Sequence, residues 1–130
     1  MQDKPWETES DLEVWTDPIT GYPCRMVRNS SGVWCGYVGI PEGHPWAAVD
    51  RDSIDVEVHG GLTFSEHATL PDWDPPGDRR FWLGFDCNHY GDLAPKREIL
   101  LGLGGVYRDA RYVTEQVVNL ALQARAAETR

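Results

Sequence analysis

The sequence has few cysteines, few basic residues and no long hydrophobic run, and each shortage excludes a class of protein. Its three cysteines are odd in number and form no CxxC pair, which argues against a disulfide framework. No stretch approaches the ~18 consecutive apolar residues of a membrane-spanning helix. The polar start MQDKPWETES lacks an apolar signal segment. These features predict a protein of the reducing cytoplasm that does not use a membrane.

Basic residues are outnumbered, with 12 Lys and Arg against 21 Asp and Glu and a net charge of −9. A phosphate backbone is bound by clustered Lys and Arg, so nucleic acid is not an expected partner. The acids are scattered along the chain, and the ordinary consequence of such a charge is solubility. An acidic protein that inhibits a host protein by direct binding stays open as an alternative.

The length of 130 residues fits a single domain over residues 1–130. A chain of this size can bury a core without disulfides or metals, and its six tryptophans predict a core rich in aromatic rings. Residues 1–20 are rich in acids, Thr and Pro, which predicts an N-terminal arm or loop with at most one short strand.

Three stretches predict β-strands. Residues 22–40 predict a hairpin around the turn residues 29–32, and the apolar run 81–85 predicts a central strand. Residues 54–59 alternate strictly between apolar and polar side chains, which predicts a strand with Ile54, Val56 and Val58 on one face.

One helix is predicted over residues 110–127, where apolar side chains recur at helical spacing and Asp109 is a suitable N-cap. Residues 93–107 leave helix and loop open, because several glycines weaken a helix there. The predicted fold is α+β: a mainly antiparallel sheet of four to six strands packed against the C-terminal helix.

The candidate ligand site combines two polar stretches, one at a glycine pair and one in a loop after the apolar run 81–85. The glycine pair would let a ligand approach the backbone closely, although an ordinary tight turn explains it equally well. Polar loops that follow a hydrophobic strand often bind ligands. The predicted ligand-binding residues are His59, Gly60, Gly61, Thr63, Asp86 and His89.

A metal-dependent hydrolase is the alternative, since imidazole and carboxylate groups suit zinc, manganese or iron. Asp92 belongs to the same loop, and Glu57 is a candidate base. A solvent-facing sheet surface would explain the carboxylates of residues 55 and 57 without any metal. The metal ligands in this hypothesis are Asp55, His59, Asp86 and His89.

Three strings carry a resemblance: CGYVGIPEGHP at residues 35–45, DVEVHGGLT at 55–63 and GFDCNHYGD at 84–92. With them the chain resembles a family of small uncharacterised bacteriophage and bacterial proteins, over roughly residues 22–122. The resemblance implies a cytosolic, phage-associated protein and carries no activity. By analogy with small phage proteins that antagonise host defence, it suggests a counter-defence factor.

A nucleotide-like ligand is the corresponding hypothesis, supported by that analogy and by the many aromatic rings near the candidate stretches. The acidic balance argues against a strongly anionic ligand, and few basic residues are near, Arg108 among them. No cofactor is predicted. The partners left open are a small-molecule ligand, a second copy of the chain and a host protein.

Overall fold

The structure, a computed structural model, describes residues 4–68, 71–102 and 104–129. Its strands are β1 (Leu12–Thr16), β2 (Pro23–Arg28), β3 (Trp34–Pro41), β4 (Phe64–His67) and β5 (Arg80–Asp86). Its α-helices are α1 (Pro95–Leu101) and α2 (Ala110–Ala127), and its 3-10 turns are η1 (Pro5–Glu7), η2 (Arg51–Ser53) and η3 (Pro71–Trp73).

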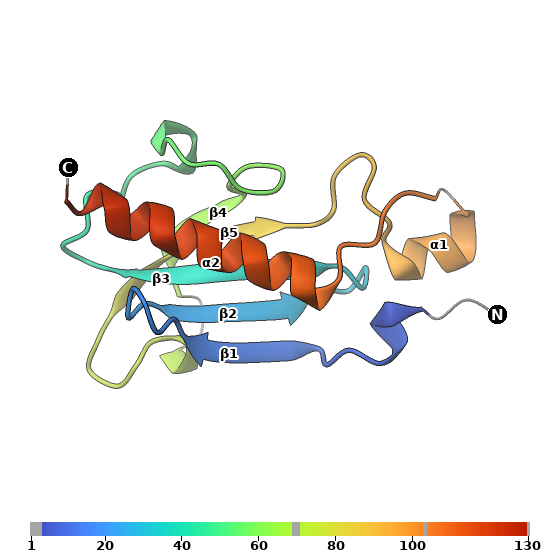
Figure 1. Cartoon of the computed structure of the whole chain (residues 1–130), viewed down its shortest axis with the longest axis horizontal. Coiled ribbons are helices and arrows are strands. Elements are labelled where there is room, and N and C mark those ends of the chain that lie inside the picture. Colours follow the sequence, from blue (N-terminus) through green and yellow to red (C-terminus); the bar gives the residue numbers. More distant parts are fainter. Residues whose placement is uncertain (1–3, 69–70, 103, 130) are drawn as a thin grey trace.

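The five strands form one antiparallel sheet in the order β1-β2-β3-β5-β4 (Figure 1). Strands β2 and β3 form the predicted hairpin, with Cys24 opposite Val38. Strand β5, predicted to be central, pairs with β3 on one side and β4 on the other, so it is an inner strand, whereas β3 takes the middle of the sheet.

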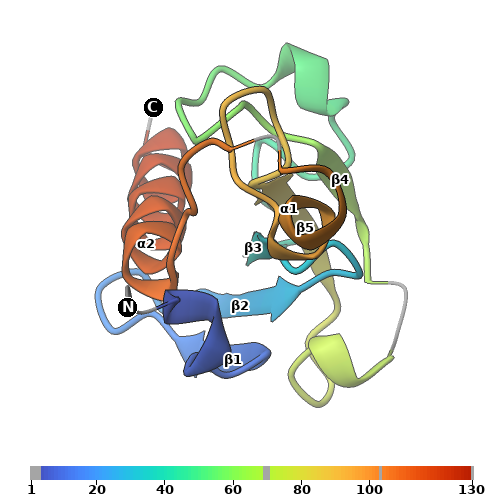
Figure 2. The same ribbon diagram turned by 90° about the vertical axis from the view of Figure 1, so that its right-hand side faces the viewer.

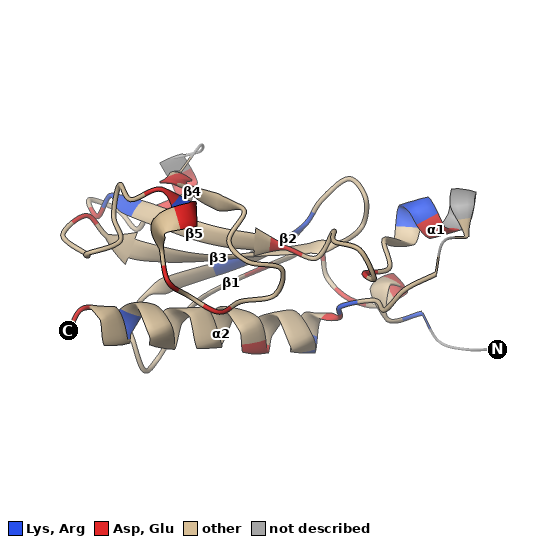
Figure 3. Ribbon diagram, turned by 90° about the horizontal axis from the view of Figure 1, so that it is seen from above, with Lys and Arg blue, Asp and Glu red and all other residues tan. Residues whose placement is uncertain are grey.

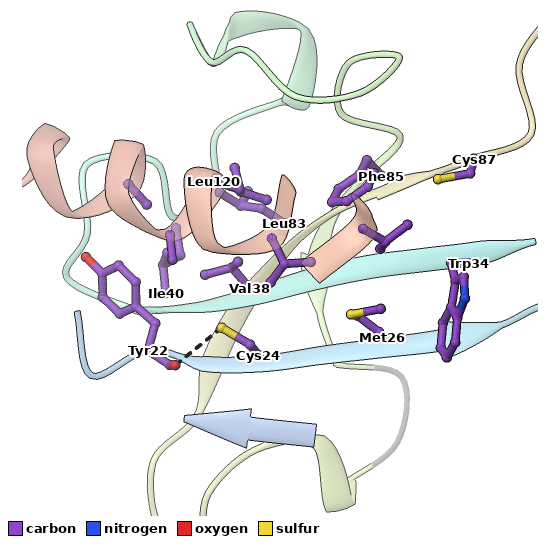
Figure 4. Packing of buried hydrophobic residues seen from close by; sticks show 14 of the residues in the cluster. Tyr22, Cys24, Met26, Trp34, Val38, Ile40, Leu83, Phe85, Cys87 and Leu120 are labelled. Carbon is purple, nitrogen blue, oxygen red and sulfur yellow. Dashed lines mark hydrogen bonds between the residues drawn. The ribbon is translucent and has the colours of Figure 1, made fainter. Parts of the chain in front are cut away.

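Helix α2 covers one face of this sheet, which confirms the predicted α+β architecture (Figures 1 and 2). Its N-cap is Asp109, whose Oδ1 accepts a 2.8 Å hydrogen bond from the backbone N–H of Tyr112. The buried side of the helix packs on a core of large apolar side chains from β2, β3 and β5 (Figure 4). The buried residues of α2 include Val113, Val117, Leu120, Ala121 and Ala124.

A glycine in β3 lets the helix approach the sheet closely. A Cβ placed on Gly36 would lie 2.6 Å from Val117 Cγ2 and 2.7 Å from the ring of Phe85. No side chain could fit there without moving the helix, so this strand glycine serves close packing.

The opposite face of the sheet carries an aromatic cluster around Trp73. This residue belongs to η3, which lies on the side of the sheet away from α2 (Figure 2). The Trp73 ring lies edge-on to Tyr37 at 4.9 Å and to Trp82 at 5.4 Å, and Arg25 stacks over it. The many tryptophans thus stabilise both faces of the sheet.

The strand predicted over residues 54–59 is wrong. These residues are extended but pair with no strand, and they run beside α2. The Gln123 side-chain amide accepts a 2.9 Å hydrogen bond from Glu57 N and donates a 2.7 Å hydrogen bond to Glu57 O. Gln116 Oε1 accepts a bond of 2.9 Å from His59 N. Helix side chains therefore satisfy backbone groups that a neighbouring strand would otherwise satisfy.

The alternation in this segment still reports which side is buried. Ile54 is 8% exposed, and Val56 and Val58 pack against the core, whereas Asp55 and Glu57 are exposed. Alternation of apolar and polar residues shows that every second side chain is buried. It is expected for any extended segment that lies on a core, whether or not that segment is part of a sheet.

The described part of the N-terminal arm contains the edge strand β1 and is held by Glu9 and by Arg28, whose guanidinium donates hydrogen bonds to the carbonyl oxygens of Trp6 and Glu9. The Glu9 carboxylate accepts hydrogen bonds from Tyr107 Oη (2.6 Å), the backbone N–H of Ala110 (2.7 Å) and Trp34 Nε1 (3.2 Å). A carboxylate at the first turn of α2 also complements the helix dipole.

None of the helices in the described part of the chain is long and apolar enough to cross a membrane.

Candidate functional site

Two segments far apart in the sequence meet at the end of the sheet where β5 finishes and α2 begins. His59 ends the extended segment beside α2, and His89 lies in the loop after β5. Their ring centroids are 5.9 Å apart, with the rings edge to face. The two candidate stretches are therefore neighbours in space.

Asp92 is the central residue of this cluster. Its side chain is 2% exposed, and its Oδ2 accepts hydrogen bonds from His59 Nε2 (2.8 Å) and from the His89 backbone N–H (3.1 Å). Its Oδ1 accepts a 2.9 Å hydrogen bond from Arg108 Nε. Burial alone would raise the pKa of Asp92, but the hydrogen bonds from His59, Arg108 and the His89 backbone outweigh it and lower that pKa. The carboxylate is thus ionised and fixed in place.

The imidazole of His59 is held on its other side by α2. Its Nδ1 lies 2.7 Å from the Tyr112 hydroxyl, and the Tyr112 ring lies beneath the Arg108 guanidinium at 5.0 Å. Burial raises the pKa of Tyr112. Both ring nitrogens of His59 are therefore engaged within the protein, and these two contacts fix the orientation of the imidazole.

Gly60 makes room for the ring of His89. Its φ of 69° is left-handed, and a Cβ there would lie 2.8 Å from His89 Cε1 and closer still to Nε2 and Cδ2 of the same ring. His89 Nε2 lies 3.2 Å from Asp86 Oδ1, but the two atoms are poorly aligned for a hydrogen bond. Among the described residues, this buried Nε2 has no hydrogen-bond partner.

A cavity of about 510 Å³ opens beside this cluster. Its walls are the loop after β5, the first turn of α1 with the residue before it, and glycines that follow α1. Such a volume lies in the range of pockets that enclose a small ligand. The lining residues are Asn88, His89, Tyr90, Gly91, Asp92, Ala94, Arg97, Glu98, Gly104 and Gly105.

The structure brings only some of the predicted site residues together. His59, Gly60, Asp86 and His89 adjoin one another, but His89 alone among them lines the cavity. A Cβ on Gly61 would have no neighbour within 4 Å. Exposed Thr63 uses its backbone N–H in a 2.9 Å hydrogen bond to the carbonyl oxygen of Gly84.

The predicted metal ligands do not gather around one point. Within residues 4–68, 71–102 and 104–129, no group of three or more His, Cys, Asp or Glu side chains could hold a metal ion. Asp55 and Glu57, the candidate ligand and base, are exposed on the segment beside α2.

Cys87 and His44 have structural roles. Burial raises the pKa of the Cys87 thiol to about 12, so the thiolate needed for nucleophilic attack is not populated near neutral pH. His44 Nε2 lies 2.7 Å from the carbonyl oxygen of Ala124, and its Nδ1 accepts a hydrogen bond from Trp46 N.

Sequence reasoning missed much of the cavity wall. Asn88 and Tyr90 lie within the predicted loop but were not among the predicted ligand-binding residues, and Arg97 and Glu98 lie in the region left ambiguous. No local sequence pattern marked Tyr112 as part of the site, because its partner His59 is 53 residues away in the chain.

Comparisons with protein-family models, with curated proteins and with solved structures find no match.

Proposed function

We propose that this protein binds a small molecule in the cavity beside His89. The observation that carries the proposal is the rigid support behind that residue. Asp92, buried and held by three donors, fixes the His89 backbone, while Gly60 packs against the ring. Binding sites depend on such preorganised side chains, since little conformational freedom is then lost when a ligand enters.

The lining of the cavity supports the same function. It combines an imidazole, an amide and a guanidinium group from His89, Asn88 and Arg97 with the backbone of the glycines that follow α1. A few convergent polar groups in a concave site are what ligand specificity requires. The resemblance to phage proteins would make such binding a means of sequestering a nucleotide-like signal in counter-defence.

The other two functions have less support. A metal-dependent hydrolase needs several ligands around one ion, and no such group is present in the described residues. An acidic inhibitor of a host protein rests only on the net charge of −9, since the acidic residues are scattered along the sequence.

A thermal-shift screen of a metabolite library, followed by calorimetry, tests the proposal. A ligand present at 100 times its Kd stabilises the folded state by about 2.7 kcal/mol, which such a screen detects. We expect at least one compound whose stabilisation is lost in His89→Ala and kept in His67→Gln, a matched control on β4. The proposal fails if no compound stabilises the protein, or if every binder is indifferent to His89→Ala.

A further inference from the structure

The lining of the cavity identifies a class of ligand. We infer that the cavity binds an uncharged nitrogen heteroaromatic ring, such as the base of a nucleoside, stacked on Tyr90. This inference rests on the proposed function. Three features carry this inference: an exposed ring at the rim, hydrogen-bonding groups suited to a base edge, and the balance of charge.

The first feature is Tyr90, which lines the cavity and is 107% exposed, as open as an isolated tyrosine. Nearby Val106 is 55% exposed, and its backbone bonds to the loop through Gly91 O. An exposed ring beside a cavity offers a flat apolar surface, and aromatic bases stack on such rings with little loss of conformational entropy.

The second feature is a set of groups that match the edge of a base. The Asn88 amide carries two N–H donors and one acceptor oxygen, and this Oδ1 accepts a hydrogen bond from the Arg97 guanidinium, which fixes the orientation of the amide. Glu98 uses Oε2 to accept a 2.7 Å hydrogen bond from the Gly104 backbone. Its second oxygen can accept from a ring N–H or an exocyclic amino group. Planar amide and carboxylate groups are the side chains that read bases elsewhere in proteins.

The third feature is charge. Among the charged residues of the lining, Glu98 and Arg97 have opposite charges, and Asp92 is buried and already paired with Arg108. On α1, the two basic residues Lys96 and Arg97 are followed directly by the acidic Glu98 (Figure 3). With a net charge of −9 on the whole chain, this lining offers no cluster of cations for several phosphates. A neutral base or nucleoside therefore fits better than a nucleoside triphosphate.

Isothermal titration calorimetry with adenosine, guanosine, cytidine and uridine tests the inference, with ribose and the four triphosphates as comparison probes. We expect at least one nucleoside to bind, with a Kd lower than those of ribose and of its own triphosphate. Tyr90→Ala should raise the Kd of that nucleoside about tenfold, within the range that stacking contributes. Tyr90→Phe, which keeps the ring, should leave it within threefold. Since Tyr90 is fully exposed, neither variant disturbs the core.

The inference is overturned if no nucleoside binds at 1 mM (about 4 kcal/mol of binding free energy), if ribose binds as well, or if Tyr90→Ala leaves the Kd unchanged. These failures are distinct from failure of the proposed function. A non-aromatic binder that depends on His89 would remove the heteroaromatic ligand and leave a small-molecule site.

Discussion

Replacing Gly60 by alanine tests whether the glycine exists to seat the His89 ring. Gly60 and Gly61 are neighbours with similar left-handed backbones, at φ values of 69° and 79°. A Cβ on Gly60 would overlap the His89 imidazole, whereas a Cβ on Gly61 would have no neighbour within 4 Å. The two substitutions therefore share the backbone strain and differ in the contact.

The magnitudes follow from those two contributions. Left-handed strain costs about 1–2 kcal/mol, and the stiffer unfolded chain offsets about 0.4–1 kcal/mol of it, so Gly61→Ala should lower the free energy of unfolding by about 0.5–1 kcal/mol. Forcing an extra carbon against a packed ring adds about 1–3 kcal/mol, so Gly60→Ala should lower the free energy of unfolding by about 1.5–4 kcal/mol.

Urea unfolding of the single and double variants measures both numbers. In a His89→Ala background the overlapping ring is gone, so Gly60→Ala should there cost no more than Gly61→Ala. The resulting double-mutant cycle should show a coupling of about 1–3 kcal/mol between Gly60 and His89. Equal destabilisation by the two glycine substitutions, or a Gly60→Ala cost that persists without the His89 ring, would refute this reasoning.

Four further substitutions test other contacts of the site, the N-terminal arm and the core. Asp92→Asn should lower the free energy of unfolding at pH 7 by about 2–3 kcal/mol. Since folding lowers the pKa of Asp92, its stabilisation is present above the unfolded pKa of about 3.9 and is lost as pH falls through the folded pKa. The free energy of unfolding, measured in urea from pH 7 to 3, should therefore fall more steeply with decreasing pH for wild type than for this variant. Parallel curves for the two proteins would contradict the role given to Asp92. Glu9→Gln should lower the free energy of unfolding by about 1–2 kcal/mol and speed proteolysis of the N-terminal arm, because the charge-assisted hydrogen bonds from three donors are lost. Cleavage at the wild-type rate would show that Glu9 does not anchor the arm. Gln123→Ala should accelerate hydrogen exchange of Glu57 N–H while α2 stays protected, since that amide loses its acceptor; exchange at the wild-type rate would show that the side chain does not hold the segment. Leu120→Ala, at a fully buried position, should cost about 2–5 kcal/mol in thermal or urea unfolding, and a loss below about 1 kcal/mol would mean that α2 is not packed as described.

Several elements were predictable because their signals are local. The helix over residues 110–127 is encoded by apolar spacing and by the Asp109 cap, both of which act within a few residues. The hairpin of β2 and β3 is likewise encoded by turn residues between a weakly alternating stretch and an apolar one.

The candidate site was predictable in outline only. The sequence marks His59 and His89 as polar residues beside glycines or after an apolar strand, and their rings do lie next to each other. The sequence did not show that Asp92 bonds to His59 and to Arg108, because these contacts join side chains up to 33 residues apart. Part of the cavity wall comes from α1, which lies in the region that the sequence left open between helix and loop. Its position depends on the tertiary structure.

By itself, the amino-acid order determined the class of fold, the amphipathic helix and which side chains of residues 54–59 face the core. Only the tertiary structure decided that this extended segment bonds to α2 and not to a strand, and that His59 therefore reaches Asp92. The physical reason is that alternation reports burial alone, whereas the partner of a backbone N–H is whichever acceptor the fold brings within reach. Here that acceptor is the side chain of Gln116, 57 residues further along the chain.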